Sequence, residues 1–314
     1  MHVLQFFSPQ ALVSRSRLRV LSLVLLLAFL ILGGSASAFA QGSSPDDGHD
    51  RGHGRNASAV YTMNNDPTDN AILVFARAAD GTLSPSGSFS TSGQGTGAGL
   101  GSQGALVLSD NGRWLFAVNA GSNEVSVFAV RGQTLYLVDT ISSGGEKPIS
   151  LTQHGRLLYV LNAGGSGNIT GFYLGGRGRL FPIPNATRSL SNGGVGDAPG
   201  PAQIAFTPNG RQLVVTEKAS NQILTYQVRP LGRTAEPEIH ASAGETPFGF
   251  DFTPRGDLIV SEAFGGAADA SAASSYALRR GQFQVISSSV PTNQTAACWV
   301  VVTKDGRFAY TTNT

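Results

Sequence analysis

The sequence predicts an all-β protein with the β-propeller architecture, and three observations lead to this prediction. A short string with a central glycine recurs along the chain at intervals typical of propeller blades. Short apolar runs flank each copy of the string, as in the strands of a β-hairpin. No amphipathic run with helical spacing follows Leu32.

Composition supports this fold class and excludes several functions. Glycine occurs 40 times in 314 residues, which favours many tight turns between short strands. The 22 basic residues nearly balance the 20 acidic ones, and a net charge of +2 attracts a nucleic acid only weakly. A single cysteine, Cys298, excludes a disulfide framework and a cysteine-based zinc site, and we expect it to be a small buried hydrophobe.

The first forty residues have the pattern of a secretory signal peptide. Arg15, Arg17 and Arg19 precede an apolar run over 20–32, and an A-x-A site ends at Ala40. The run is shorter than the roughly 20 apolar residues of a membrane span, so a permanent anchor is the less favoured alternative. We therefore predict that the protein is secreted or periplasmic.

Three segments follow from this pattern. Residues 1–40 are the predicted signal peptide, and a membrane would be contacted only through this signal if it stayed uncleaved. Residues 41–56 contain no apolar side chain and are predicted to be a flexible linker. The repeats begin after it, so residues 57–314 are the predicted propeller.

Five copies of the glycine string locate the first hairpin of each unit. Each copy has two turn residues before the glycine and a charged residue after it, except that the second has glutamine and histidine at the turn. The copies lie at 109–113, 152–156, 207–211, 253–257 and 303–307. Their glycines are 43, 55, 46 and 50 residues apart, which is the spacing of one propeller blade.

Each predicted blade has up to four antiparallel strands. First strands are predicted at 105–108, 149–151, 203–206, 248–252 and 299–302. Second strands follow the strings at 114–118, 157–161, 213–216, 258–261 and 308–311. Third strands are predicted at 125–128, 169–173, 223–226 and 274–276, with weaker fourth strands such as 135–141 and 282–286.

The two ends of the repeat region are incomplete units. Residues 60–83 have the pattern of a blade without its first strand, and the last unit stops after its second strand. We therefore expect about five and a half blades. A seven-bladed parent that is truncated at its C-terminus would account for this number.

The long connections predict which face carries the function. They lie at 91–104, 185–200, 263–273 and 287–296, and propeller geometry places them on the face where the second strands end. The opposite face has only tight glycine turns. Polar residues end the second strands, namely Asn119, Asn162, Glu217, Glu262 and Asn313.

Four phrases resemble the seven-bladed lactonase family, which includes 6-phosphogluconolactonase-like proteins and the carboxymuconate lactonizing enzyme. They lie at 80–83, at 116–128, at 200–206 and at 207–211, and the resemblance covers about residues 58–314. It implies the propeller fold and the opening of a lactone ring. It also implies a glutamate at a second-strand end, where this chain has Glu217.

The family's cationic residues are largely replaced. The resemblance places an arginine and a histidine where this chain has Ala202 and Gln203, and a further histidine at Ile149. Another arginine position holds Cys298 or Phe248. Phosphorylated or polycarboxylate lactones would lose their charge partner, so a neutral lactone is the expected substrate.

Two functions remain open. In the first, the protein is an exported, monomeric lactone hydrolase without metal or cofactor, and Glu217 and Glu262 are catalytic. The predicted substrate-binding residues are Gln203, Lys218, Asn119, Asn162 and Trp299. In the second, the propeller binds a small ligand or a protein without catalysis. The two glutamates would then hydrogen-bond loop backbones, and Trp299 would be a core aromatic residue.

Overall fold

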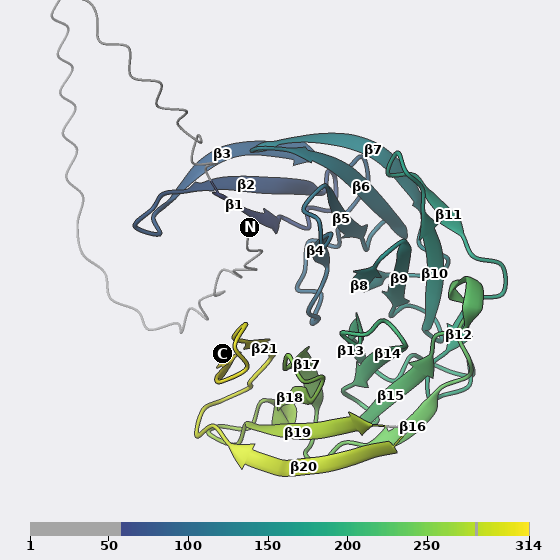
Figure 1. The fold of residues 1–314 in the computed structure, drawn as a ribbon, viewed down its shortest axis with the longest axis vertical. Helices are drawn as coiled ribbons and strands as arrows, with labels where there is room; N and C mark the ends of the chain where they lie inside the picture. The colour runs from purple at the N-terminus through teal and green to yellow at the C-terminus, as the bar shows by residue number, and fades with distance from the viewer. Residues whose placement is uncertain (1–57, 280–281, 314) are drawn as a thin grey trace, which may run out of the picture. The chain divides into compact units, whose positions relative to one another are not determined.

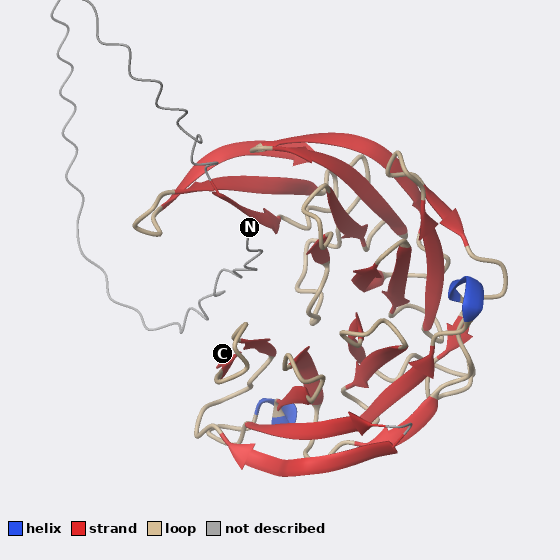
Figure 2. Cartoon of the chain, in the orientation of Figure 1, coloured by secondary structure: helices blue, strands red, loops and turns tan. Residues whose placement is uncertain are grey.

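The computed structural model describes residues 58–279 and 282–313. The predicted signal peptide and linker lie outside the described residues. The described residues form 22 strands and two 3-10 turns, Pro230–Gly232 and Phe264–Gly266 (Figure 2). None of these residues belongs to a helix long and apolar enough to cross a membrane. The all-β prediction is confirmed.

Six antiparallel sheets follow one another around a common axis (Figure 1), and we number them as blades one to six. Blade one contains β1 (Ser58–Met63), β2 (Ala71–Arg77) and β3 (Leu83–Ser90). Blade two contains β4 (Leu106–Leu108), β5 (Trp114–Asn119), β6 (Glu124–Arg131) and β7 (Thr134–Ser142). Blade three contains β8 (Pro148–His154), β9 (Leu157–Asn162), β10 (Asn168–Leu174), β11 (Leu180–Pro182) and β12 (Arg188–Ser189).

The remaining sheets repeat the same order from the axis outward. Blade four contains β13 (Pro201–Phe206), β14 (Gln212–Glu217), β15 (Gln222–Gln227) and β16 (Glu238–Ala241). Blade five contains β17 (Pro247–Phe252), β18 (Leu258–Glu262), β19 (Ala272–Arg279) and β20 (Gln282–Pro291). Blade six contains β21 (Trp299–Val302) and β22 (Ala309–Thr312).

The predicted hairpins form where the sequence places them, and one blade departs from the pattern. The outer strand of blade three is split into β11 and β12, which both pair with β10. Pro182 and Pro184 cause the break, since proline cannot donate to a strand ladder. Proline also opens the first strands of blades three, four and five, a position where its missing N–H costs nothing.

The core lies between the blades, which pack face to face. Tyr61 and Ile72 of blade one pack with Leu115 and Phe128 of blade two. A larger cluster joins blades two, three and four, and a third joins blades four and five around Phe250. Each fully buried side chain of this kind contributes about 1.5–3 kcal/mol, so most of the stability comes from contacts between blades.

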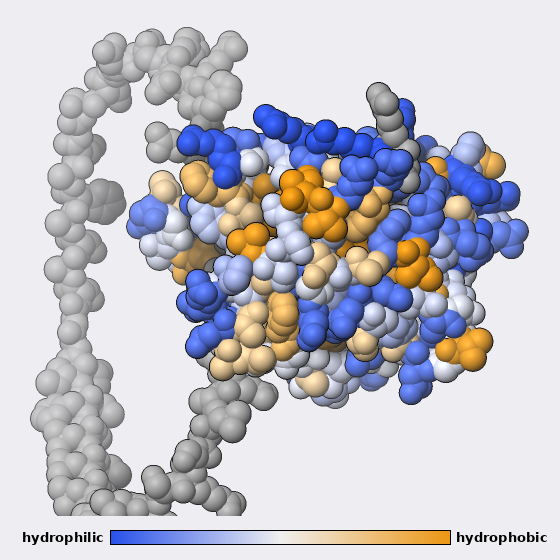
Figure 3. Space-filling model, turned by 90° about the horizontal axis from the view of Figure 1, so that it is seen from below, coloured by the Kyte–Doolittle hydropathy of each residue, from blue (hydrophilic) through white to orange (hydrophobic). Residues whose placement is uncertain are grey.

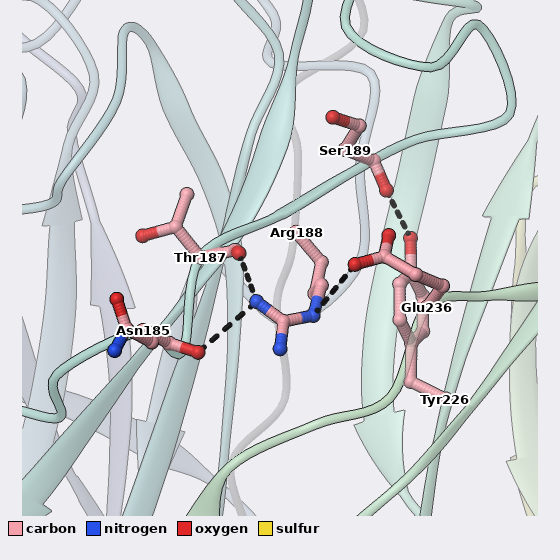
Figure 4. Close-up of polar contacts among 6 residues, drawn as sticks. All are labelled: Asn185, Thr187, Arg188, Ser189, Tyr226 and Glu236. Atoms are coloured by element: carbon pink, nitrogen blue, oxygen red, sulfur yellow. Dashed lines mark hydrogen bonds and ion pairs between the residues drawn. The ribbon is translucent and has the colours of Figure 1, made fainter.

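A strut on the outer rim joins blades three and four (Figure 4). The Arg188 guanidinium donates to the carbonyl oxygens of Asn185 and Thr187 at 3.0 and 2.7 Å and lies 3.2 Å from the Glu236 carboxylate. The Tyr226 hydroxyl donates to the Ser189 carbonyl oxygen at 3.0 Å. Burial raises the pKa of Tyr226 well above its usual value, so the phenol stays a donor. The ion pair adds little because Glu236 is exposed, so the link between the two blades depends mainly on the hydrogen bond from Tyr226 to Ser189.

The outer strand of blade five is largely exposed. Seen from this side, the surface carries hydrophobic residues in small groups among hydrophilic ones (Figure 3). Val285, Ile286 and Val290 of β20 are each more than half exposed. Register shifts in its pairing with β19 mark bulges, which make an edge strand a poor template for pairing with another chain.

Side chains join the first strands around the axis. No sheet pairs two first strands in the described residues. Four side chains instead accept from backbone N–H groups of the next blade: Ser150 from Ile204, Thr152 from Phe206, Gln203 from Phe250, and Asp251 from Val302. The Gln203 amide makes two hydrogen bonds to the Phe250 backbone: Oε1 accepts from the N–H, and Nε2 donates to the carbonyl oxygen at 3.0 Å. We call these contacts the axial bridges.

The segment 101–104 crosses the axis ahead of β4. The Gln103 amide exchanges two hydrogen bonds with Val300 of blade six, at 3.0 and 3.1 Å, and its backbone N–H donates to Ala202 of blade four. Gly104 has a φ of +87°, and a Cβ there would lie 2.9 Å from Ser150 Oγ, so the crossing requires glycine. One short segment thus holds several blades at the axis.

Candidate functional site

The long connections share one face with the ends of the second strands, as the sequence predicts. The β5–β6 loop contacts the β3–β4 connection, with Gly121 N–H donating to the Gln94 carbonyl oxygen at 2.9 Å. The β9–β10 loop contacts the β12–β13 connection in the same way, from Ala198 N–H to the Gly165 carbonyl oxygen at 2.9 Å. The first strands start on this face, where the axial channel opens.

Lys218 lies at this opening, directly after β14. Its ammonium donates to the Gly101 carbonyl oxygen and lies 4.6 Å from the centroid of the Phe248 ring. A Cβ on Gly101 would come within 3.3 Å of the nitrogen, so the glycine leaves room for it. A cation over an aromatic face is a stabilising arrangement that fixes the position of the charge.

Burial of Lys218 makes its ammonium easier to deprotonate. Burial lowers the pKa of Lys218 to about 8; Cys298 acts in the opposite direction, and the like charge of Lys147 lowers the pKa further. The ammonium is therefore more acidic than that of an exposed lysine. A group of this kind is both a hydrogen-bond donor and a potential base or nucleophile near neutral pH.

Phe248, Cys298 and Trp299 complete what we call the mouth cluster with Lys218. Phe248 and Trp299 meet edge to face with centroids 6.2 Å apart, and the Trp299 indole donates to the Ser102 carbonyl oxygen at 3.0 Å. Cys298 is half-buried beside Phe248 rather than fully buried. Burial raises the pKa of the Cys298 thiol, so it remains protonated at neutral pH.

A cavity of about 920 Å³ occupies the channel beyond the mouth cluster. It begins at Gln103 and Trp299 and reaches the Asp110–Gly112 turn on the opposite face. Its walls are mainly apolar residues of β4, β13, β17 and β21. Asp251 is a half-buried carboxyl in this wall, and desolvation raises its pKa although the Val302 and Phe252 N–H groups act against this.

Glu217 and Glu262 are fully buried, and each carboxylate is held by hydroxyl groups. Glu217 accepts from the backbone N–H of Ser191 at 3.0 Å and from the hydroxyls of Ser191 and Ser220. Glu262 accepts from the hydroxyls of Ser274 and Ser289, and a Cβ on Gly244 would collide with its carboxylate. The two carboxylates have no hydrogen-bond partner in common. Only the contact from the Ser191 N–H is to a loop backbone, as the alternative expects, and the other partners are serine hydroxyls.

Asn119 and Asn162 are also fully buried. Asn119 donates to Ser126 Oγ at 2.8 Å and accepts from the Asn70 amide at 2.8 Å, which links blades one and two. Asn162 donates to Asn168 Oδ1 at 2.8 Å. Both amides thus tie the ends of β5 and β9 to neighbouring strands, and neither residue lines the cavity.

The structure brings two of the seven predicted site residues together, Lys218 and Trp299, on either side of Phe248. Gln203 lines the cavity, but its amide is engaged in an axial bridge. Sequence reasoning missed the roles of Phe248 and Lys147. The sequence could have indicated them, because both lie at the start of a first strand and the starts of the first strands surround the opening. Among the described residues, no group of acidic, histidine and cysteine side chains could hold a metal.

Comparison with known proteins gives one family and several related structures. The family model for lactonase, 7-bladed β-propeller, matches residues 53–180 and 166–264. No curated protein sequence matches the chain. Similar solved structures include a candidate 6-phosphogluconolactonase from Bacteroides fragilis, with a TM-score of 0.64 and 20% identity over 84% of this chain and 76% of that chain.

Two further structures have the same fold. A candidate 6-phosphogluconolactonase from Bacteroides uniformis has a TM-score of 0.59 and 21% identity over 77% of this chain and 71% of that chain. The periplasmic gluconolactonase PpgL of Pseudomonas aeruginosa has a TM-score of 0.53 and 23% identity over 72% of this chain and 65% of that chain. At these identities the likeness shows the fold alone.

Proposed function

Because the chain belongs to the lactonase family of seven-bladed β-propellers, we propose that it is an exported enzyme that hydrolyses a small neutral lactone at the mouth cluster. The observation that carries this proposal is the Lys218 ammonium, held over the Phe248 ring at the opening of the channel. Export is supported by the signal-peptide pattern of residues 1–40. We further propose that the protein acts as a monomer on a small molecule.

Lactone hydrolysis needs a donor where negative charge develops. Water attacks the carbonyl carbon, the carbonyl oxygen becomes an oxyanion, and the ring C–O bond then breaks to give a hydroxy acid. An ammonium has three N–H donors, and in Lys218 one of them meets Gly101. A prepositioned donor to the oxyanion is worth about 10²–10³ in kcat.

The remaining residues of the mouth cluster fit an uncharged ring. Trp299 is half-buried and lines the cavity, so it offers apolar surface near the ammonium, while the buried Phe248 ring supports both residues. The family's arginine position holds Ala202 and its two histidine positions hold Gln203 and Ile149, which removes the partners of a phosphorylated substrate. The gluconolactonase likeness makes δ-gluconolactone a suitable first substrate to test.

We propose positioning roles for Glu217 and Glu262. Both carboxylates accept from serine hydroxyls, so Glu217 holds the loops that carry Ser191 and Ser220, whereas Glu262 joins β19 to β20. A buried carboxylate engaged in this way lacks the direct access to water that a general base needs.

The test is hydrolysis of δ-gluconolactone by the full chain and by a Lys218→Met variant, with acid release measured near pH 7. Methionine keeps the length and the contact with Phe248, so we expect folding to persist while kcat/KM falls about 10²–10³-fold. Lys304→Met is the matched control, since Lys304 lies exposed in the Asp305 turn. We expect the kcat/KM of the Lys304→Met variant to equal that of the wild type.

The pH profile gives a second readout. Because the donor is the protonated form of Lys218, the enzymatic rate should fall as the pH rises through about 8, after subtraction of the uncatalysed rate. Equal activity of the Lys218→Met variant and the wild type would contradict the proposal.

A non-catalytic propeller that binds a ligand or a protein at the long-loop face is the second candidate. The burial of both glutamates and their hydrogen bonds to serine hydroxyls favour it. Absence of turnover across a panel of neutral lactones, with the fold intact, would support binding instead of catalysis. Calorimetric titration of the same lactones would then measure the ligand-binding role directly.

A further inference from the structure

The chain uses lysine sparingly. It contains three lysines, Lys147, Lys218 and Lys304, against nineteen arginines. Arginine carries positive charge at any physiological pH, whereas lysine can lose its proton and react as an amine. Two of the three lysines act on one another electrostatically at the channel opening. Lys218 thus places at the opening an amine that can lose its proton, which an arginine could not provide.

We propose that Lys218 is a nucleophilic amine that small acyl electrophiles, including lactones and activated esters, acylate selectively. The nitrogen is fixed by the Gly101 carbonyl oxygen and by the face of Phe248. It lies at an opening to solvent, in a half-buried position. Acylation by a lactone rests on the function proposed above, whereas acylation by an activated ester does not.

The chemistry needs no additional reactant. The Lys218 nitrogen attacks the lactone carbonyl carbon, the ring C–O bond breaks, and the ring oxygen takes the proton that the nitrogen loses. The product is an amide that carries a hydroxyl group. Acylation removes the positive charge of Lys218, so the acylated protein would lose its oxyanion donor.

The lowered pKa of Lys218 sets the expected selectivity. At pH 8 about half of this lysine is unprotonated, compared with roughly 0.4% for an ordinary lysine. A less basic nucleophile is also intrinsically weaker, as is known for thiols. We therefore expect Lys218 to react about tenfold faster than Lys304 at pH 8.

The experiment uses the full chain and a substoichiometric amount of the N-hydroxysuccinimide ester of acetic acid. Digestion and mass spectrometry measure acetylation of the three lysines and of Cys298 as a function of pH. We expect the Lys218 rate to level off above about pH 8, and the exposed Lys304 serves as the reference lysine for the overall reaction. Lys147→Met should move the Lys218 midpoint upward, because a like charge is removed.

Incubation with δ-gluconolactone forms the second arm, with Lys218→Arg as the matched variant that keeps the charge without the nucleophile. In the wild type, we expect acylation to add the mass of the lactone to Lys218. In the variant, we expect no residue of the mouth cluster to gain this mass. A Lys218 rate at pH 8 no higher than that of Lys304, or acetylation of Cys298 ahead of Lys218, would overturn the inference. Selective acetylation without lactone turnover would reject the proposed function alone.

Discussion

Replacement of Gln203 by alanine tests whether its amide binds substrate or joins two blades. The variant removes both hydrogen bonds to Phe250, at 2.7 and 3.0 Å. Gln203 is 7% exposed and Phe250 is 1% exposed, so two buried backbone groups lose their partner. Each unsatisfied group costs about 1–3 kcal/mol.

The expected loss lies at the lower end of that sum. Both residues line the cavity, and water entering from it can satisfy part of the exposed backbone. We therefore expect about 2–3 kcal/mol, which corresponds to a melting temperature lower by roughly 5–10 °C in a chain of this size. Circular dichroism during heating measures this change, and lactone hydrolysis at low temperature measures KM.

Ser150→Ala is the graded control for Gln203→Ala. It removes the acceptor for the Ile204 N–H, at 3.1 Å, and the partner of the Gln103 carbonyl oxygen. A smaller decrease in melting temperature is expected, since a hydroxyl makes a less extensive bridge than an amide. If the Gln203→Ala variant has the melting temperature of the wild type while its KM rises tenfold or more, Gln203 contacts substrate and its bridging role is refuted.

Three further variants test other parts of the molecule. Glu217→Gln should cost about 1–3 kcal/mol through its hydroxyl partners and leave kcat within threefold; a large loss of kcat at an unchanged melting temperature would instead make it catalytic. Burial lowers the pKa of His240 below 6.5, with Glu238 opposing, so stability is complete above about pH 6.5 and falls as the pH drops through the window below it. His240→Gln should remove this dependence from a series of melting curves, and an unchanged slope would assign it to other groups. Gly249→Ala should lower the melting temperature by several degrees because a Cβ there lies 2.3 Å from Gln103 Oε1, whereas Gly99→Ala, with nothing within 4 Å, should melt with the wild type.

The hairpins could be predicted from the sequence because local chemistry determines them. The glycine of every string has a positive φ, from 58° at Gly155 to 86° at Gly256. Such a backbone conformation favours glycine, so its spacing in the sequence is the spacing of the turns. The flanking apolar runs then form strands whose faces pack between blades.

The partners of the polar site residues could not be predicted in this way. Ser191 reaches Glu217 across 26 residues, and Gln103 reaches Val300 across 197 residues. Both contacts depend on how the blades curve around the axis, which no local pattern encodes. A polar residue at a strand end can serve a ligand or a backbone group equally well, and in Glu217 and Gln203 the observed partners belong to the protein itself.

The axial bridges have a consequence for how such rings can change over evolutionary time. In each bridge a side chain of one blade recognises the main chain of the next, and main-chain groups are the same whichever residue carries them. A duplicated or transplanted blade would therefore find its anchoring groups already present on its new neighbour. It would need only one suitable amide, carboxyl or hydroxyl of its own, so blades could be shuffled without matched changes on both sides of the new junction.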